Sequence, residues 1–175
     1  MRLQGRRAVV TGASSGIGRA IALAFAREGA RVVVNYNTRA AAAAACVAEI
    51  ADMGGEAWAI GANVADATAV SALVREAVSV LGGIDEWVNI AGADILTGKG
   101  ALLSDAEKLT PLIEDDLRGT IQCCWAAAPE IGRGGSIINL SWDLALHGME
   151  GRNPEMFAAV SDHGVTGRAV KQGRV

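Results

Sequence analysis

The segment from Thr11 to Gly18 constrains the fold more than any other part of the sequence. It reads Thr-Gly-Ala-Ser-Ser-Gly-Ile-Gly and lies between an apolar run at 7–11 and a helical pattern at 15–28. Glycines at a strand-to-helix turn let a ligand approach the backbone, and the free N–H groups and dipole of the helix favour negative charge. The segment therefore predicts a phosphate-binding turn. The alternative is a purely structural turn in which Ser15 caps the helix.

Short apolar runs and helical periodicities alternate along the chain, which is typical of a parallel sheet with helices on both faces. Val32, Val33 and Val34 form a β-branched run, as expected of a strand that is covered on both sides. We expect strands at 7–11, 31–35, 56–61, 85–89 and 135–141, helices at 15–28, 39–53, 67–81, 105–131 and 155–168, and a loop at 92–103. The predicted fold is α/β, a Rossmann-like doubly wound parallel sheet of about five strands.

The composition of the chain excludes several classes of protein. The chain has 175 residues, so we treat 1–175 as a single domain. A hydrophobic content of 51% with 20% charged residues indicates a buried core rather than disorder. The net charge of −3 offers no basic excess, which argues against nucleic-acid binding. The sequence has neither a long apolar run nor a signal-peptide pattern, so we expect no membrane association and a cytoplasmic location.

The cysteines do not indicate a disulfide framework. Cys123 and Cys124 are adjacent, and adjacent cysteines rarely form a bridge. We interpret them and Cys46 as buried free thiols. Because no cysteine or histidine stands at a ligand spacing, the sequence predicts no metal site.

Several stretches together resemble the short-chain dehydrogenase/reductase family. Thr11 with the Gly-x-x-x-Gly-x-Gly spacing is similar to that family's phosphate turn. Residues 63–66 resemble its segment beside the adenine, with Asn63 in place of an acid, and 84–92 resemble its fourth strand. Residues 134–141 resemble the fifth strand, which carries the catalytic serine. The resemblance covers 6–157 and implies hydride transfer between a nicotinamide and a small carbonyl or alcohol substrate.

The end of the second predicted strand indicates which nicotinamide cofactor to expect. NAD sites place an acid there against the ribose hydroxyls, whereas NADP sites offer a cation to the 2′-phosphate. Residues 35–39 contain no acid and end in Arg39, so we expect NADP(H) rather than NAD(H). The alternative for Arg39 is a solvated residue in the first turn of a helix. The expected cofactor-binding residues are Gly12, Ser14, Ser15, Gly16, Ile17, Gly18, Asn35, Tyr36, Arg39, Asn63, Val64, Asn89, Ala91 and Gly92.

The catalytic residues that the resemblance implies are altered. In the family a Tyr donates a proton to the substrate and a Lys four residues later lowers the pKa of that Tyr. Phe157 and Ser161 stand at these two positions, and Asp116 stands where the family has an Asn. Ser141 is the candidate catalytic serine, or else a strand-end hydroxyl. Because a positioned general acid contributes about 10² to 10⁴ in rate, we expect any activity to be impaired.

Three outcomes therefore stay open from sequence. The chain is an oxidoreductase of reduced activity, a non-catalytic nucleotide-binding fragment or pseudoenzyme, or a chain that does not fold stably alone. The sequence after Ser161 departs from the family pattern, which suggests a truncated or frame-disrupted copy whose C-terminal part is missing and whose fifth strand forms an exposed edge. The second half of the 105–131 helix is apolar all round, so we expect another surface to cover it in a homo-oligomer.

Overall fold

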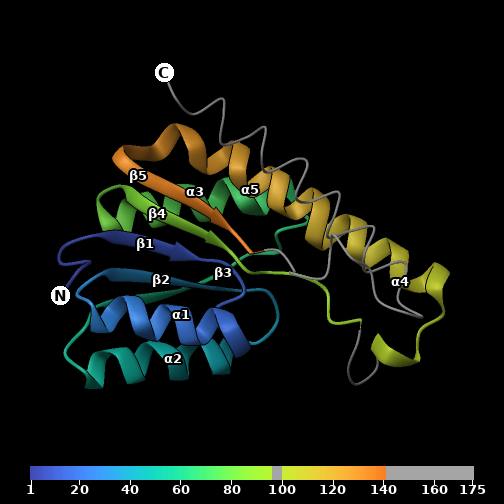
Figure 1. The fold of residues 1–175 in the computed structure, drawn as a ribbon, viewed down its shortest axis with the longest axis horizontal. Coiled ribbons are helices and arrows are strands. Elements are labelled where there is room, and N and C mark those ends of the chain that lie inside the picture. Colours follow the sequence, from blue (N-terminus) through green and yellow to red (C-terminus); the bar gives the residue numbers. More distant parts are fainter. Residues whose placement is uncertain (96–99, 141–175) are drawn as a thin grey trace.

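Five parallel strands form one sheet, in the order β3-β2-β1-β4-β5 (Figure 1). The structure is a computed structural model that describes residues 1–95 and 100–140. The strands are β1 (Arg7–Val10), β2 (Arg31–Tyr36), β3 (Ala57–Gly61), β4 (Ile84–Asn89) and β5 (Ile131–Asn139). Within the described residues, β5 pairs only with β4. The predicted α/β, Rossmann-like parallel sheet is confirmed.

Helices cover both faces of this sheet. Figure 1 shows α1 (Gly16–Arg27) and α2 (Ala40–Asp52) on one face, and α3 (Ala67–Leu81) and α5 (Thr120–Ala127) on the other. Before α5 the chain forms the turn η1 (Gly100–Leu102), the helix α4 (Asp105–Pro111) and a π-helical segment, η2 (Leu112–Gly119). A short turn, η3 (Ala128–Glu130), leads into β5. No helix in the described ranges is long and apolar enough to cross a membrane.

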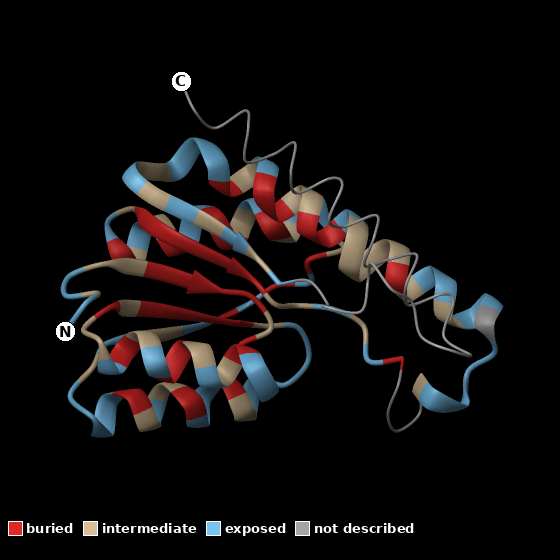
Figure 2. Ribbon diagram, viewed as in Figure 1, coloured by how far each residue is buried: buried red, intermediate tan, exposed pale blue. Residues whose placement is uncertain are grey.

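The apolar core forms two layers, one on each side of the sheet. Along β2, Val32 and Val34 pack with the α1 and α2 side, and Val33 packs with the α3 and α5 side. All three valines are fully buried, and Figure 2 shows the central strands as buried along their length. Burial on both faces explains why this strand lacks the alternation of apolar and polar residues.

The expected long helix at 105–131 differs from the structure in two respects. Its path is divided by the π-helical segment η2, which begins directly after Pro111. Proline lacks a backbone N–H and so removes one helical hydrogen bond, which favours a change of helix type at this point. The helix also ends earlier, because β5 begins at Ile131 rather than at Gly135.

The early start of β5 depends on an irregularity in its pairing with β4. Ile84 pairs with Ile131, but Glu86 pairs with Ser136, so the ladder contains a bulge. Gly134 lies within it at a φ of +77°. The glycines at 132, 134 and 135 suggest a turn in the sequence, whereas in the structure they form the bulged part of a strand.

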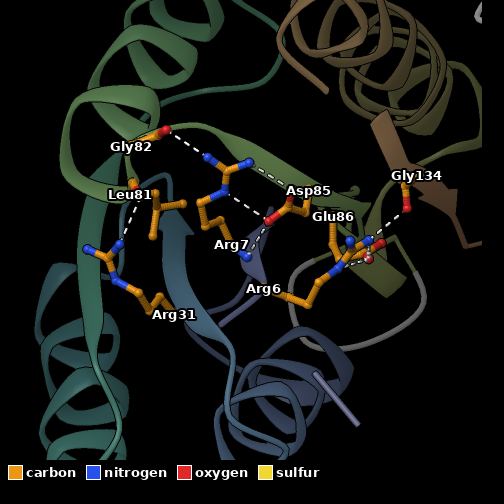
Figure 3. A network of polar contacts seen from close by, with 8 residues as sticks. All are labelled: Arg6, Arg7, Arg31, Leu81, Gly82, Asp85, Glu86 and Gly134. Atoms are coloured by element: carbon orange, nitrogen blue, oxygen red, sulfur yellow. Dashed lines mark hydrogen bonds and ion pairs between the residues drawn. The ribbon is translucent and has the colours of Figure 1, made fainter. Parts of the chain in front are cut away.

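Ion pairs join β1 to β4 at the amino ends of the strands (Figure 3). Arg7 Nη2 lies 2.8 Å from Asp85 Oδ1, and the Arg7 backbone N–H donates to Asp85 Oδ2 at 3.0 Å. These hydrogen bonds hold the pKa of the Asp85 carboxyl group below its usual range. Arg6 pairs with Glu86 and donates to the carbonyl oxygen of Gly134 at 2.9 Å. The Arg6–Glu86 pair therefore holds the bulge of β5 against β4.

The apolar face of α5 is only partly covered. Cys123, Cys124 and Ala127 are buried against the sheet, but Trp125 is 71% exposed. Within the described residues, no other part of the chain covers Trp125, although we expected the apolar surface of this helix to be covered. The predicted helix at 155–168 lies outside the described residues.

Candidate functional site

A cavity of about 720 Å³ lies at the carboxyl ends of the strands. The chain leaves β1 toward β2 on one side, while β4 lies on its other side, so the strand order reverses next to β1. Open α/β sheets bind ligands at such a reversal. The lining comprises Gly12, Ser14, Ser15, Ile17, Gly18, Asn35, Asn37, Thr38, Arg39, Ala62, Asn63, Val64, Ile90, Ala91, Gly92, Ala93, Asp94, Ile95, Gly100, Leu103, Pro111, Asp115 and Leu140.

The turn after β1 requires glycine at its first position. Gly12 has a φ of +62°, and a Cβ atom there would lie 2.8 Å from the Cα of Ala91. No side chain fits between the two loops at this distance. Thr11 strengthens the same junction, because its Oγ1 accepts hydrogen bonds from the N–H groups of Ile90 at 3.0 Å and Ala91 at 3.1 Å. The turn after β1 and the loop after β4 are therefore held together, and both line the cavity.

The start of α1 is free of a side-chain cap. Ser15 takes the N-cap position, but its side chain makes no capping hydrogen bond. The alternative interpretation, in which Ser15 caps the helix, is therefore not what the structure shows. N–H groups in the first turn of a helix have no partner within the helix, and together with the helix dipole they favour an anion. The start of α1 is thus suited to a phosphate group.

Asn35 is buried at the end of β2 and supports this turn. Its Oδ1 accepts from Gly12 N–H at 3.3 Å, and its Nδ2 donates to the carbonyl oxygens of Ile60 at 3.1 Å and Ala62 at 3.2 Å. The side-chain amide thus joins the loops that follow β1 and β3. Although Asn35 lines the cavity, its polar atoms are engaged by the protein itself.

Among the described residues that line the cavity, Arg39 is the cation. Its guanidinium group is exposed and Nη1 donates to Ser15 Oγ at 3.3 Å, which places it beside the start of α1. Tyr36, by contrast, is outside the lining of the cavity. Its ring packs against Gly61, where an added Cβ would lie 3.1 Å from Tyr36 Cζ. The end of β2 thus offers the cavity a positive charge and no carboxylate.

The loop after β3 forms the adjoining wall. Asn63 Oδ1 accepts from Ala65 N–H at 3.0 Å, and the carbonyl oxygen of Val64 accepts from Gln122 Nε2 at 3.0 Å. Both Asn63 and Val64 line the cavity. Gln122 on helix α5 therefore holds the loop after β3 in place through this hydrogen bond.

The segment η2 contributes one acidic residue, Asp115, to the lining of the cavity. Asp116 Oδ1 accepts from Ala93 N–H at 2.7 Å, so this carboxylate binds the loop after β4. Asp115 lines the cavity and is half-buried. Burial raises the pKa of its carboxyl group, and the nearby charge of Glu114 raises it further.

Residues 6–154 match the family model for short chain dehydrogenases. The chain belongs to the short-chain dehydrogenase family. It is 39% identical over 170 residues to the 3-oxoacyl-[acyl-carrier-protein] reductase FabG of Staphylococcus aureus strain Mu50, an alignment that covers 95% of this chain and 68% of that protein. The crystal structure of a short chain dehydrogenase from Burkholderia cenocepacia J2315 in complex with NADP has a TM-score of 0.89 at 35% identity, covering 98% of this chain and 70% of that chain.

A second solved structure agrees with this assignment. The short chain dehydrogenase from Mycobacterium avium has a TM-score of 0.85 at 34% identity and covers 98% of this chain and 66% of that one. The family resemblance seen in the sequence is thus confirmed.

Most of the residues expected to bind a cofactor in this short-chain dehydrogenase line the cavity. Gly16, Tyr36 and Asn89 do not. Asn89 is buried at the end of β4, where its Nδ2 donates to Asn139 Oδ1 at 2.7 Å. The catalytic candidates Ser141, Phe157 and Ser161 lie outside the described residues. Within 1–95 and 100–140, no group of three or more His, Cys, Asp or Glu residues could hold a metal ion.

Sequence reasoning missed several lining residues. They are Asn37, Thr38, Ala62, Ile90, Ala93, Asp94, Ile95, Gly100, Leu103, Pro111, Asp115 and Leu140. Asn37, Ala62 and Ile90 directly follow β2, β3 and β4, so the ends of the predicted strands could have indicated them. No sequence pattern places Asp115 in the cavity, because its position depends on how η2 crosses the ends of the strands.

Proposed function

We propose that this short-chain dehydrogenase binds NADP(H) at the carboxyl ends of the strands, with the diphosphate against the start of α1. The observation that carries the proposal is the uncapped first turn of α1 opening into the cavity beside Arg39. Free N–H groups and a guanidinium group are the donors that phosphate oxygens prefer.

The preference for NADP(H) over NAD(H) follows from the charges at the end of β2. Asn35 and Tyr36 occupy the strand end, where NAD sites present a carboxylate. Arg39 stands beside Ser15, at the mouth, and is available to a 2′-phosphate. The similarity to a structure in complex with NADP supports this choice.

The proposed chemistry is that of the family, in which the bound nicotinamide accepts or supplies a hydride and the substrate is a small carbonyl or alcohol. Ser141 would orient the substrate. The chain contains one tyrosine, Tyr36, and its ring packs against Gly61 outside the cavity lining. It is therefore not placed to donate a proton to a substrate. With Phe157 and Ser161 at the Tyr and Lys positions, we propose weak hydride transfer, and a nucleotide-binding pseudoenzyme is the second candidate.

Binding titrations test the cofactor. Purified protein is titrated with NADPH and with NADH, alongside Arg39→Ala and the control Arg75→Ala, which changes an exposed arginine on α3. A hydrogen bond to a charged group contributes about 1.5 to 3 kcal/mol, so we expect NADPH to bind about 10- to 100-fold more tightly than NADH. Arg39→Ala should remove most of that difference and leave NADH affinity unchanged. Failure to bind either dinucleotide, or a preference for NADH, would overturn the proposal.

A turnover assay separates the two candidate functions. The protein is incubated with NADPH and a panel of small carbonyl compounds, and NADPH oxidation is followed by absorbance. A slow rate that Ser141→Ala abolishes would support the oxidoreductase. NADPH binding without any turnover would support the pseudoenzyme.

We also propose that a second copy of the chain covers the exposed part of α5. Trp125 is 71% exposed, and large exposed aromatic side chains favour interfaces. Sedimentation velocity of the wild type should show a dimer or larger species that Trp125→Ser weakens. A wild type that stays monomeric at all concentrations tested would reject this part of the proposal.

A further inference from the structure

Asp115 places a carboxyl group in the cavity that the proposed function assigns to a polyanion. The residue belongs to η2, is half-buried and lines the cavity. Its carboxyl group has neither a hydrogen-bond donor nor an ion-pair partner among residues 1–95 and 100–140. As far as the described residues go, a dinucleotide in the cavity would therefore meet a negative charge that no cation pairs with.

Contacts of the neighbouring residues show where this carboxyl group lies. Gly119, one turn further along, lies against Val64, since an added Cβ would be 2.8 Å from Val64 Cγ2. Asp116 binds the N–H of Ala93 at 2.7 Å. The segment η2 thus bridges the loops that follow β3 and β4. Because β2 and β1 lie between β3 and β4, the glycine turn after β1 lies between those two loops. Asp115 and the proposed phosphate site at the start of α1 therefore line the same cavity.

None of the charged residues in the described ranges forms an ion pair with Asp115. Glu114 pairs with Arg118, four residues along the same segment, and Asp116 binds Ala93. Asp94, on the loop after β4, adds a second carboxylate to the lining. Lys108 belongs to the neighbouring helix α4 and does not line the cavity. Among the described lining residues the cation is Arg39, which binds Ser15 at the mouth.

We propose that Asp115 takes up a proton when the dinucleotide binds, so that binding becomes tighter as the pH falls. This inference rests on the proposed function. A bound ligand would displace water from the carboxyl group and bring phosphate charges near it, and both changes favour the neutral form. The pKa of Asp115 in the complex then exceeds that in the free protein. Affinity therefore increases as the pH falls through the pKa of the complex and levels off below the pKa of the free protein.

The test compares the wild type with Asp115→Asn, which has nearly the same shape and no charge. NADPH and NADH are titrated from about pH 4 to 8, a range that begins near the ordinary pKa of an aspartate and includes the second pKa of a phosphate monoester near 6. Because NADPH itself titrates there, the measured quantity is the ratio of the wild-type Kd to the variant Kd at each pH. At about pH 8 we expect the variant to bind about tenfold more tightly, and the ratio should approach one at the acidic end.

A matched control and a second readout separate this effect from a general charge effect. Asp52→Asn makes the same change at the exposed end of α2 and should leave the Kd ratio at one across the range. Calorimetry in two buffers of different ionisation enthalpy, at a pH where the Kd ratio changes, should show more proton uptake by the wild type than by Asp115→Asn. If the Asn variant does not fold, Asp115→Ser supplies the same comparison, and the wild-type proton count with NADH, which has no 2′-phosphate, needs no variant.

The outcomes distinguish this inference from the proposed function. NADPH binding with a Kd ratio of one at every pH would reject the inference alone. Weaker binding by Asp115→Asn at neutral pH would also reject it, since the carboxylate would then be accepting a hydrogen bond from the ligand. If neither the wild type nor Asp115→Asn binds NADPH or NADH at any pH, the proposed function fails as well.

Discussion

The side chain of Asn35 holds the turn that begins at Gly12. The N–H of Gly12 donates to Asn35 Oδ1 at 3.3 Å, and the next N–H along the chain, that of Ala13, donates to the carbonyl oxygen of Asn35 at 2.8 Å. Asn35 is only 1% exposed. A buried amide on β2 thus fixes the position of the turn that we propose for the diphosphate.

Replacing Asn35 with Asp should destabilise the protein. The change removes the Nδ2 donor from the carbonyl oxygens of Ile60 and Ala62 and buries a carboxylate beside them. An unsatisfied buried group costs about 1 to 3 kcal/mol, so we expect the free energy of unfolding in urea to fall by about 2 to 4 kcal/mol at neutral pH. Asn37→Asp, at an exposed position, should change it by less than about 0.5 kcal/mol. Equal effects of the two changes would contradict this role of Asn35.

Gly12→Ala and Gly16→Ala form a matched pair. Both glycines have positive φ angles, +62° and +54°, so alanine is strained at either position. At Gly16 an added Cβ meets open space, whereas at Gly12 it would lie 2.8 Å from the backbone of Ala91. We expect Gly16→Ala to cost about 1 to 2 kcal/mol and Gly12→Ala several kcal/mol more, as measured by thermal unfolding. Similar costs would show that the two loops can separate freely.

Asp85 should contribute to stability in a pH-dependent way. Arg7 holds the pKa of the folded-state carboxyl group below its unfolded value. The stabilisation is therefore complete above the unfolded-state pKa, about 3.9, and is lost as the pH falls through the lower folded-state pKa. We expect Asp85→Asn to lower the free energy of unfolding by about 2 kcal/mol at pH 7, and the difference from the wild type to shrink below about pH 4. Glu76→Gln, on the exposed side of α3, serves as the control. A difference that is independent of pH would contradict the ion pair.

The cysteine thiols should react only after unfolding. Cys46, Cys123 and Cys124 are buried thiols that are not in disulfide bonds. Burial and the neighbouring Cys124 raise the pKa of Cys123 to about 12, and burial raises that of Cys46. Because the thiolate is the reactive form, a colorimetric disulfide reagent at about pH 8 should detect almost no thiol in the native protein. In denaturant it should detect all 3 cysteines. Rapid native reaction of any one of them would show that its surroundings open readily.

Local patterns in the sequence predicted the sheet and the first part of the site. Asn63 and Val64 follow one strand, and Ala91 and Gly92 follow another, so the strand ends placed them at one edge. The strand β5 was predicted to begin too late, since its bulged glycines resemble a turn until Glu86 and Arg6 hold them against β4. Tyr36 was expected to bind the cofactor; its ring packs against Gly61, and it is not among the residues that line the cavity.

The sequence alone determined the alternation of strands and helices, the glycine turn before α1 and the absence of an acid at the end of β2. These features depend on residues that are close together in the chain, so their pattern is visible without a structure. Only the tertiary structure decided that Asn35 supports the turn from below and that Asp115 faces the cavity. Both placements depend on contacts between distant segments, because β2 lies beside β1 in the sheet and η2 crosses the ends of β3 and β4. Such contacts follow from packing, which no local pattern specifies.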